Sequence, residues 1–424
     1  MLKTLKDAWK VLDIRKRIGF TLLMVVVFRL GNAIPVPFMD KAIIKQIMSG
    51  QEGGIVSLLN LLSGGSLRQM SIFALSIYPY ITASIILQLL TVAFPRLGEL
   101  TREGEEGKKR MGKYTKICSI ILAFIQGYAT VNGLFNRAIV DKSFLTGFVI
   151  LISLVAGSMF LVWLGEMITE RGIGNGISIL IFIGIISNMP RQIGTMIYQS
   201  RQGMLSWWKI LLFVLIAIII LVVVVLINQG ERRIPVQYAK RVVGRKMYGG
   251  QSTHIPIKVN MGGVMPVIFA SAILQLPQTI ALLFGKDMPV WLAHIFTVQT
   301  TSGLVIFSIV NMLLIIIFAF FYSAIQFNTV EYAKNLQQYG GFIMGIRPGK
   351  PTGMYLKKIS DRVTFIGAII LALVASAPML ISKAIGIQIL FGGTSIIIVV
   401  GVVLDTVKQM ESMLTMKHYK GFLK

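Results

Sequence analysis

The chain has 424 residues, of which 55% are hydrophobic and 14% are charged, a composition that argues against an ordinary soluble enzyme. A bilayer offers no water to exposed backbone amides, so a chain this apolar is expected to cross it as helices. The formal net charge of +25 could indicate a nucleic-acid partner, but basic cytoplasmic loops of a membrane protein give the same excess. A single cysteine, Cys118, excludes a disulfide framework and a cysteine zinc site, and no cofactor is expected.

Apolar stretches of membrane-spanning length follow one another along the chain, and each predicts a transmembrane helix. The first five cover residues 18–34, 72–94, 117–134, 144–164 and 177–198, and the second five cover residues 207–227, 264–284, 304–325, 363–381 and 389–407. The predicted fold class is therefore an all-α membrane protein with ten transmembrane helices.

The charge of the connecting segments predicts how these spans are oriented. About three-quarters of the lysines and arginines fall on segments that share a side with the N-terminus. Both termini are therefore expected to be cytoplasmic. The basic start of the chain runs directly into the first span without a small-residue cleavage site, so no cleavable signal peptide is expected.

The spans divide near Ser200 into an N-terminal half, residues 1–200, and a C-terminal half, residues 201–424. Each half has an odd number of spans, so the two halves are oppositely oriented. This parity permits inverted repeats, which usually place a transport pathway at their interface.

One segment between the first two spans is too short to cross a membrane. Its apolar part is bounded by glycine pairs and consists of Ile55, Val56, Ser57, Leu58, Leu59, Asn60, Leu61 and Leu62. Eight residues make about 12 Å of helix, well short of a bilayer. The segment, about residues 54–67, is either a re-entrant or interfacial helix packed as structure or a mobile element that occludes a pore.

Two long cytoplasmic loops, residues 229–262 and 326–362, are rich in lysine and arginine. The first mixes basic residues with alternating apolar ones such as Ile234, Val236 and Tyr238, a pattern that predicts a hairpin rather than a disordered tail. The second contains GIRPGKPTG around Arg347. The loops are either docking sites for partners or basic segments that only fix topology.

The spans contain few residues that could carry chemistry. Arg29 lies in the first, and Asp405 and Glu411 lie near the cytoplasmic end of the last. An inverted-repeat secondary transporter normally needs ionisable residues at mid-membrane, and an intramembrane enzyme needs a catalytic pair, so both alternatives are disfavoured. The GIGNG sequence of residues 172–176 lacks the preceding strand and the Gly-Lys-Ser/Thr ending of a P-loop, and it predicts a tight turn between helices.

Six stretches from the second span to the last carry a resemblance to a known family. They are SIFALSIYPYITASIILQLL (71–90), WLGEMITERGIGNGISI (163–179), RRIPVQYAKR (232–241), QSTHIPIKVNMGGVMPVIFAS (251–271), GIRPGKPT (345–352) and FGGTSIIIVV (391–400). With these, the chain resembles the SecY/Sec61-alpha family, the central subunits of protein-conducting channels.

The resemblance implies an hourglass pore between two inverted five-helix halves, closed by aliphatic side chains and by the short segment of residues 55–62 as a re-entrant plug helix. By position in the matching stretches, the pore ring would consist of Ile77, Ile81, Ile177, Ile181, Ile268 and Ile398. The two pairs within one span are four residues apart, so each pair is expected on one helical face. A lateral gate would lie between the second and third spans on one side and the seventh and eighth on the other.

The resemblance also implies partners. Arg232, Arg233 and Arg347 match loop arginines that engage the SecA motor ATPase or the ribosome. The small membrane subunits SecE and SecG, signal peptides and secretory preproteins, YidC, SecDF and membrane lipids complete the expected set, in the plasma membrane. The family tends to have proline where Met344 stands and glycine or methionine variants around Tyr78, and neither departure is expected to touch a proposed site.

Overall fold

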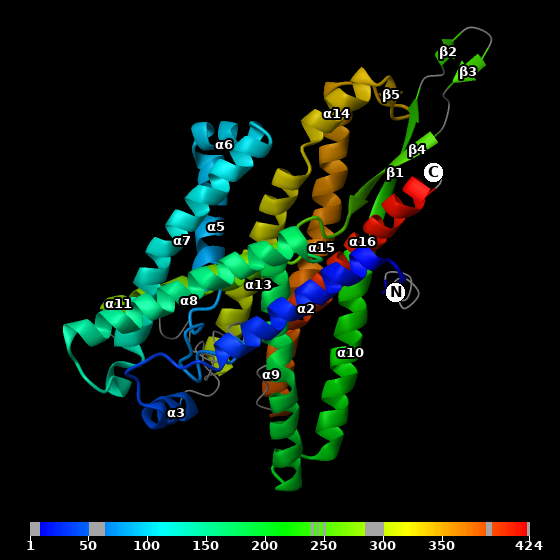
Figure 1. The fold of residues 1–424 in the computed structure, drawn as a ribbon. Helices are drawn as coiled ribbons and strands as arrows, with labels where there is room; N and C mark the ends of the chain where they lie inside the picture. The colour runs from blue at the N-terminus through cyan, green and yellow to red at the C-terminus, as the bar shows by residue number, and fades with distance from the viewer. Residues whose placement is uncertain are drawn as a thin grey trace.

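The computed structural model describes residues 9–50, 64–238, 241–243, 246–248, 252–284, 301–386 and 392–421. These residues are mainly helical, and Figure 1 shows the helices as a bundle of long rods with small strands at one end. The helices are α2 (Leu12–Asn32), α3 (Lys41–Gly50), α5 (Tyr78–Ala93), α6 (Pro95–Arg102), α7 (Glu105–Gly133), η1 (Asn136–Ala138), α8 (Phe144–Arg171), α9 (Gly176–Arg201), α10 (Trp207–Gln229), α11 (Met265–Phe284), α13 (Thr301–Gln326), α14 (Thr329–Gln338), α15 (Lys350–Ile385) and α16 (Gly393–Gly421).

Each predicted span overlaps one of these helices. Among the described residues, seven helical segments are long and apolar enough to cross a membrane, and they lie in α7, α8, α9, α10, α13 with α14, α15 and α16. The other three predicted spans correspond to α2, α5 and α11. Several helices continue beyond the apolar stretch, since α7 begins at Glu105 and α15 at Lys350. Their charged ends extend the spans past the apolar thickness of a bilayer.

The second span differs from its prediction, because helix α5 begins at Tyr78 rather than near residue 72. Residues 64–77 form buried turns, with left-handed backbone at Met70 and Ser76. Pro79 lies in the first turn of α5, where its missing N–H leaves no helical bond unmade. Ile77 is thus the residue just before the helix.

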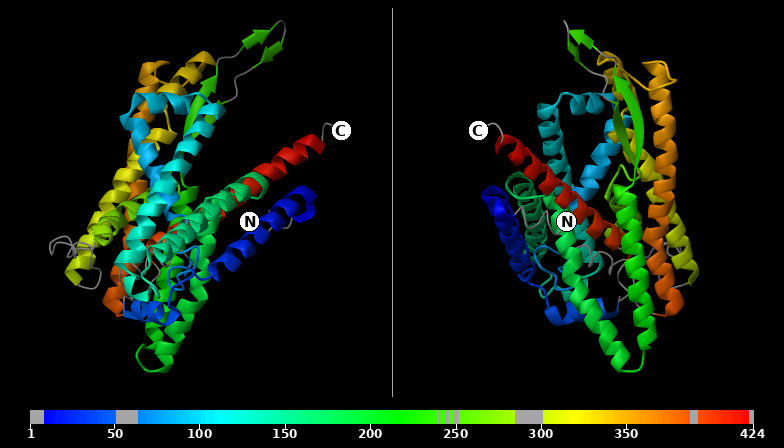
Figure 2. Two further views of the ribbon diagram at one scale, coloured as in Figure 1. Left: turned by 60° about the vertical axis from the view of Figure 1, so that its left-hand side comes forward. Right: turned by 90° about the vertical axis from the view of Figure 1, so that its right-hand side faces the viewer.

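Helices that are distant in sequence pack together around the middle of the molecule. Helix α11 lies against both α7 and α5, α13 lies against α15, and α16 contacts α9, α10 and α15. The views in Figures 1 and 2 place the connection between α9 and α10 at the end opposite to the strands. The start of α2, helices α6 and α14 and the end of α16 lie toward the strand-bearing end, which agrees with the predicted alternation of loops.

The main hydrophobic core joins α2, α5, α8, α9, α10, α11, α13, α15 and α16. Helix α10 contributes only one edge to it, through Ile220, Val224 and Ile227. Its other apolar side chains, such as Leu211 and Leu226, are exposed. An outward face this apolar fits contact with lipid tails rather than with water.

Short strands lie in the two predicted loops and add a local β element to the predicted all-α fold. Strand β1 (Glu231–Tyr238) pairs antiparallel with β4 (Ser252–Lys258), with Ile234 opposite Ile255. Strand β5 (Gly341–Phe342), from the other loop, pairs with the far end of β1. Strands β2 (Arg241–Val243) and β3 (Lys246–Tyr248) form a separate ribbon between β1 and β4. The hairpin predicted from alternating residues is confirmed.

Candidate functional site

A cavity of about 120 Å³ lies where the two halves of the chain meet. Five of the six predicted ring residues line it, and they come from the start of α5 and from α9, α11 and α16: Ile77, Ile81, Ile181, Ile268 and Ile398. Ile77, Ile181 and Ile398 are nearly inaccessible, while Ile81 and Ile268 are half-buried. The structure therefore brings together side chains that are up to about 320 positions apart in the sequence, an arrangement typical of a closed apolar constriction.

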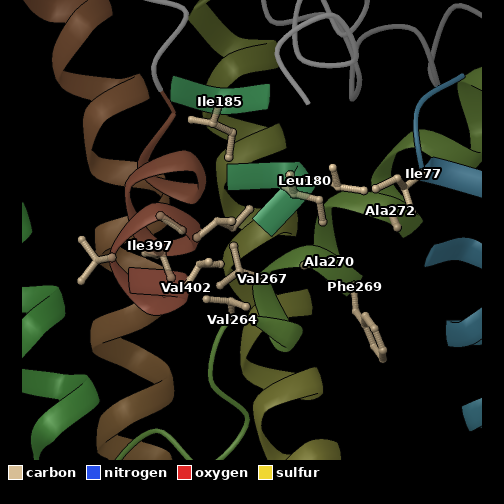
Figure 3. Packing of buried hydrophobic residues seen from close by; sticks show 14 of the residues in the cluster. Ile77, Leu180, Ile185, Val264, Val267, Phe269, Ala270, Ala272, Ile397 and Val402 are labelled. Atoms are coloured by element: carbon tan, nitrogen blue, oxygen red, sulfur yellow. The ribbon is translucent and has the colours of Figure 1, made fainter. Parts of the chain in front are cut away.

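Figure 3 shows the packing around this point, with Ile77 next to Ala272 of α11 and with Ile397 and Val402 of α16 near Val264 and Val267. These residues belong to the main hydrophobic core. The constriction is thus continuous with the packing that holds the two halves together. Any widening of it must also disturb this core.

The sixth predicted ring residue, Ile177, is not among the side chains that line the cavity. It lies in the first turn of α9, where its Cγ1 atom would be 3.1 Å from a methyl group placed on Gly165 of α8. The reason is local: α8 and α9 approach very closely at this turn, and Ile177 fills the space between them. Its role in the ring remains a prediction.

Part of the cavity lining is polar. Five lining residues each have a buried side-chain oxygen without a hydrogen-bond partner among the described residues: Gln126 of α7, Gln275 of α11, Ser308 and Asn311 of α13 and Ser376 of α15. Buried polar atoms normally have partners, so these residues are suited to meeting water or a polar guest. Sequence reasoning missed these residues because single polar residues in apolar helices carry no local pattern.

Two hydrogen bonds connect α5 with α11 and with α13. The Tyr78 hydroxyl donates to the main-chain carbonyl of Ala272 at 2.9 Å. The Tyr322 hydroxyl donates to Oε1 of Gln88 at 3.0 Å. Tyr78 also lines the cavity, so the expectation that this position lies away from every proposed site was wrong. The sequence around Tyr78 does not indicate that its phenol ring contacts α11.

The predicted docking arginines lie on the surface of the strand-bearing end. Arg232 and Arg233 are exposed on β1, and Arg233 Nε donates to Glu231 Oε1 at 2.7 Å. Arg347 is exposed in the turn before α15, and its carbonyl accepts a hydrogen bond of 2.8 Å from Thr352 Oγ1.

One small hydrophobic core ties the two loops into a single unit, with Ile234 and Val236 of β1, Ile257 of β4 and Leu336 of α14 among its members. Strand β5 extends the same unit by pairing with β1. The arginines of both loops therefore stand on one folded platform rather than on separate tails.

The predicted plug residues, 55–62, lie outside the described residues. The first described residue after them, Gly64, has left-handed backbone, and its carbonyl accepts a hydrogen bond of 3.4 Å from Ser187 of α9. A methyl group on Gly64 would be 3.0 Å from the Cα atom of Gly184, so glycine suits both the backbone and the space. Gly64 therefore contacts helix α9, which also carries Ile181.

The GIGNG turn is confirmed as a close helix–helix connection. Gly174 has left-handed backbone, and its N–H donates to Gln409 Oε1 at 2.6 Å. A methyl group on Gly176 would be 1.9 Å from the carbonyl oxygen of Gly165, which only glycine permits. The turn thus fixes α8 and α9 to each other and to α16.

Comparison with known proteins decides which family this arrangement represents. The SecY family model matches residues 71–407. The chain belongs to the SecY family. It is 44% identical over 441 residues to a protein translocase subunit SecY of Streptomyces galbus, with 100% of both chains covered. It is 42% identical over 418 residues to the SecY subunit of Escherichia coli K12, covering 97% of this chain and 94% of that one.

Solved structures agree with the family assignment at the level of the fold. The chain matches "The structure of a protein conducting channel" with a TM-score of 0.68 and 20% identity, covering 94% of this chain and 92% of that one. It matches a SecY structure described by its plug domain with a TM-score of 0.69 and 20% identity, at the same coverage. As a member of the SecY family, the chain is a multi-pass membrane protein of protein translocation.

Proposed function

We propose that the chain forms the pore through which unfolded secretory polypeptides cross the plasma membrane, between the half of residues 1–200 and the half of residues 201–424. The observation that supports this most directly is the convergence of five isoleucines on one cavity. Ile77, Ile81 and Ile181 belong to the first half, and Ile268 and Ile398 belong to the second. Separation of the halves would open the constriction at its centre.

The chemistry of the cavity suits a polypeptide of any sequence. A ring of aliphatic side chains offers ions no ligands and excludes water when closed, and it can yield around a polypeptide without binding it strongly. The polar lining residues, which include Gln126 and Asn311, offer hydrogen-bond groups to the backbone of a passing chain. In this proposal, Ile177 joins the ring when α8 and α9 move, and residues 55–62 act as the plug.

Lateral release of transmembrane segments into the bilayer is the second part of the proposal. The exit would be the seam between α5 and α7 on one side and α11 and α13 on the other. Helix α11 lies against α7 and α5, and the Tyr322 hydroxyl bonds to Gln88, so these contacts would keep the proposed exit closed. Residues of these same four helices line the cavity that contains the ring.

The strand-bearing platform is proposed to face the cytoplasm together with both termini, and to receive the partner that drives transport. Arg232, Arg233 and Arg347 are exposed there, and arginine pairs bidentately with carboxylates of a motor and with phosphates of ribosomal RNA. A neighbouring structure is "Sec61 in the Canine ribosome-channel complex from the endoplasmic reticulum", matched with a TM-score of 0.64 and 18% identity.

We propose SecA and the ribosome as the partners that drive transport, SecE and SecG as companion subunits, and YidC and SecDF as associated proteins. Since the energy comes from the driver, the chain itself is proposed not to be an enzyme.

The proposed function is tested with purified protein in lipid vesicles, assembled with its companion subunits and supplied with the motor ATPase and ATP. A secretory precursor should become protected from external protease only when the motor, ATP and an intact signal sequence are all present. Uptake of a small solute against a gradient without any precursor would instead indicate a secondary transporter. Lack of precursor protection under every condition would reject the pore.

A further inference from the structure

The hydrogen bond between Tyr78 and Ala272 joins two residues that are 194 positions apart in the sequence. Tyr78 begins α5 in the N-terminal half, and Ala272 lies in α11 of the C-terminal half. Both residues line the cavity, and the bond measures 2.9 Å. It therefore crosses the interface between the halves at the constriction itself.

The position of each partner ties this bond to the ring. Tyr78 directly follows Ile77, which is almost fully buried. Ala272 lies one helical turn after Ile268 on α11. When α5 and α11 separate at this level, Ile77 moves away from Ile268 and the hydrogen bond between Tyr78 and Ala272 breaks.

Helix α11 is also weakened next to the acceptor. Pro277 lies inside α11, and its missing N–H leaves the carbonyl of Ile273 without the usual helical donor. This is the residue directly after Ala272. The acceptor therefore lies at a point where α11 can bend most easily, and a bond that holds this point also limits the bend.

We propose that the Tyr78 hydroxyl is a latch that holds the pore ring and the lateral seam closed together, and that it determines how strong a signal sequence must be to open them. The proposal rests on the proposed function of the chain as a polypeptide pore. The acceptor belongs to α11, so the hydroxyl loses this partner when the seam opens and gains it again on closing. Because the acceptor is a main-chain carbonyl, the side chain at position 78 alone decides whether the latch exists.

The size of the expected effect follows from the free energy that one hydrogen bond contributes. Removing the hydroxyl should raise the share of open channels about fivefold, which corresponds to about 1 kcal/mol. A signal sequence with a weakened apolar core supplies less binding energy for opening, so transit of its precursor should increase more than transit of a precursor with an intact signal. A purely structural hydroxyl would lower accumulation of the protein and leave the ratio between weak and intact signals unchanged.

The test compares Tyr78→Phe with Tyr80→Phe in the motor-driven vesicle assay. Tyr80 lies on the same helix and is also half-buried, and no hydrogen bond of its hydroxyl is recorded among the described residues. Two precursors are used, one with an intact signal sequence and one with a charged residue in the apolar core of the signal. Tyr78→Met, which also lacks a donor but has a different shape, serves as the second variant.

We expect both Tyr78 variants to increase transit of the weak-signal precursor about fivefold relative to the intact one, with Tyr80→Phe equal to the unaltered protein. An unchanged ratio in the Tyr78 variants, an equal gain in Tyr80→Phe, or failure of both Tyr78 variants to accumulate would overturn the latch. Failure of the unaltered protein to pass the intact precursor would instead defeat the proposed function, so the two failures are distinguishable.

Discussion

The main-chain N–H of Ile81 donates to the carbonyl of Ile77 at 3.1 Å, so these two ring residues stand one helical turn apart although Ile77 precedes helix α5. The spacing of four residues predicted that they share a face, and the hydrogen bond shows how that holds at the start of a helix. Both side chains line the cavity. The ring thus includes a residue from the buried turns before α5, which are held by packing rather than by a helix.

A polar group in the ring should loosen the closed channel. We expect Ile268→Asn to increase resting ion leak and transit of precursors with defective signals, because a buried amide without partners costs about 1–3 kcal/mol and water relieves that cost on opening. That range corresponds to about 5- to 150-fold more open channel. Ion conductance across planar bilayers and precursor protection in vesicles measure the two effects.

The matched control is Ile280→Asn, since Ile280 belongs to the same helix but is 53% exposed. It should leave leak and signal requirement unchanged. Equal leak from both variants, or none from Ile268→Asn, would remove Ile268 from the seal.

Deletion of Val56–Leu62 should leave a protein that still inserts, because the segment supplies no span. Resting conductance should rise if the segment is the plug, while motor-driven transit persists. Accumulation in membranes and single-channel recordings on the same preparation report the outcome. Disappearance of the protein from the membrane would mean that the segment is structural packing.

Charge reversal in the platform should separate docking from folding. Arg347→Glu turns a bidentate cationic contact into a repulsive one at a partner surface, so we expect motor binding and motor-driven transit to fall at least tenfold while the protein still accumulates. Lys350→Glu, three residues later and also exposed, controls for net charge. Normal transit with Arg347→Glu, or an equal defect in both variants, argues against a specific contact at Arg347.

The close approach of α8 and α9 should not tolerate a methyl group. Gly176→Ala places its Cβ atom 1.9 Å from the Gly165 carbonyl oxygen, so we expect a loss of about 1–3 kcal/mol or more and reduced accumulation. Gly194→Ala in the same helix has nothing within 4 Å of the added atom and should be neutral or slightly stabilising. Thermal unfolding in detergent compares the two, and an intact Gly176→Ala protein would contradict the rigidity of this turn.

The sequence by itself determined the spans, their order and the grouping of basic loops at one end. These features follow from local composition: an apolar stretch such as residues 207–227 has no alternative to a helix in a bilayer, and alternating residues around Ile234 have a period that suits a strand. The helix ends were harder to predict, since α7 and α15 continue into charged sequence that hydrophobicity does not mark.

Only the tertiary structure decided which side chains meet. Nearly every position in these spans is apolar, so no local pattern distinguishes Ile181, which lines the cavity, from Ile177, which fills the space beside α8. The rotation of each helix is fixed by packing against helices far away in the sequence. For the same reason, Tyr78 looked like a neutral departure until the fold placed its hydroxyl against Ala272 in the other half of the chain.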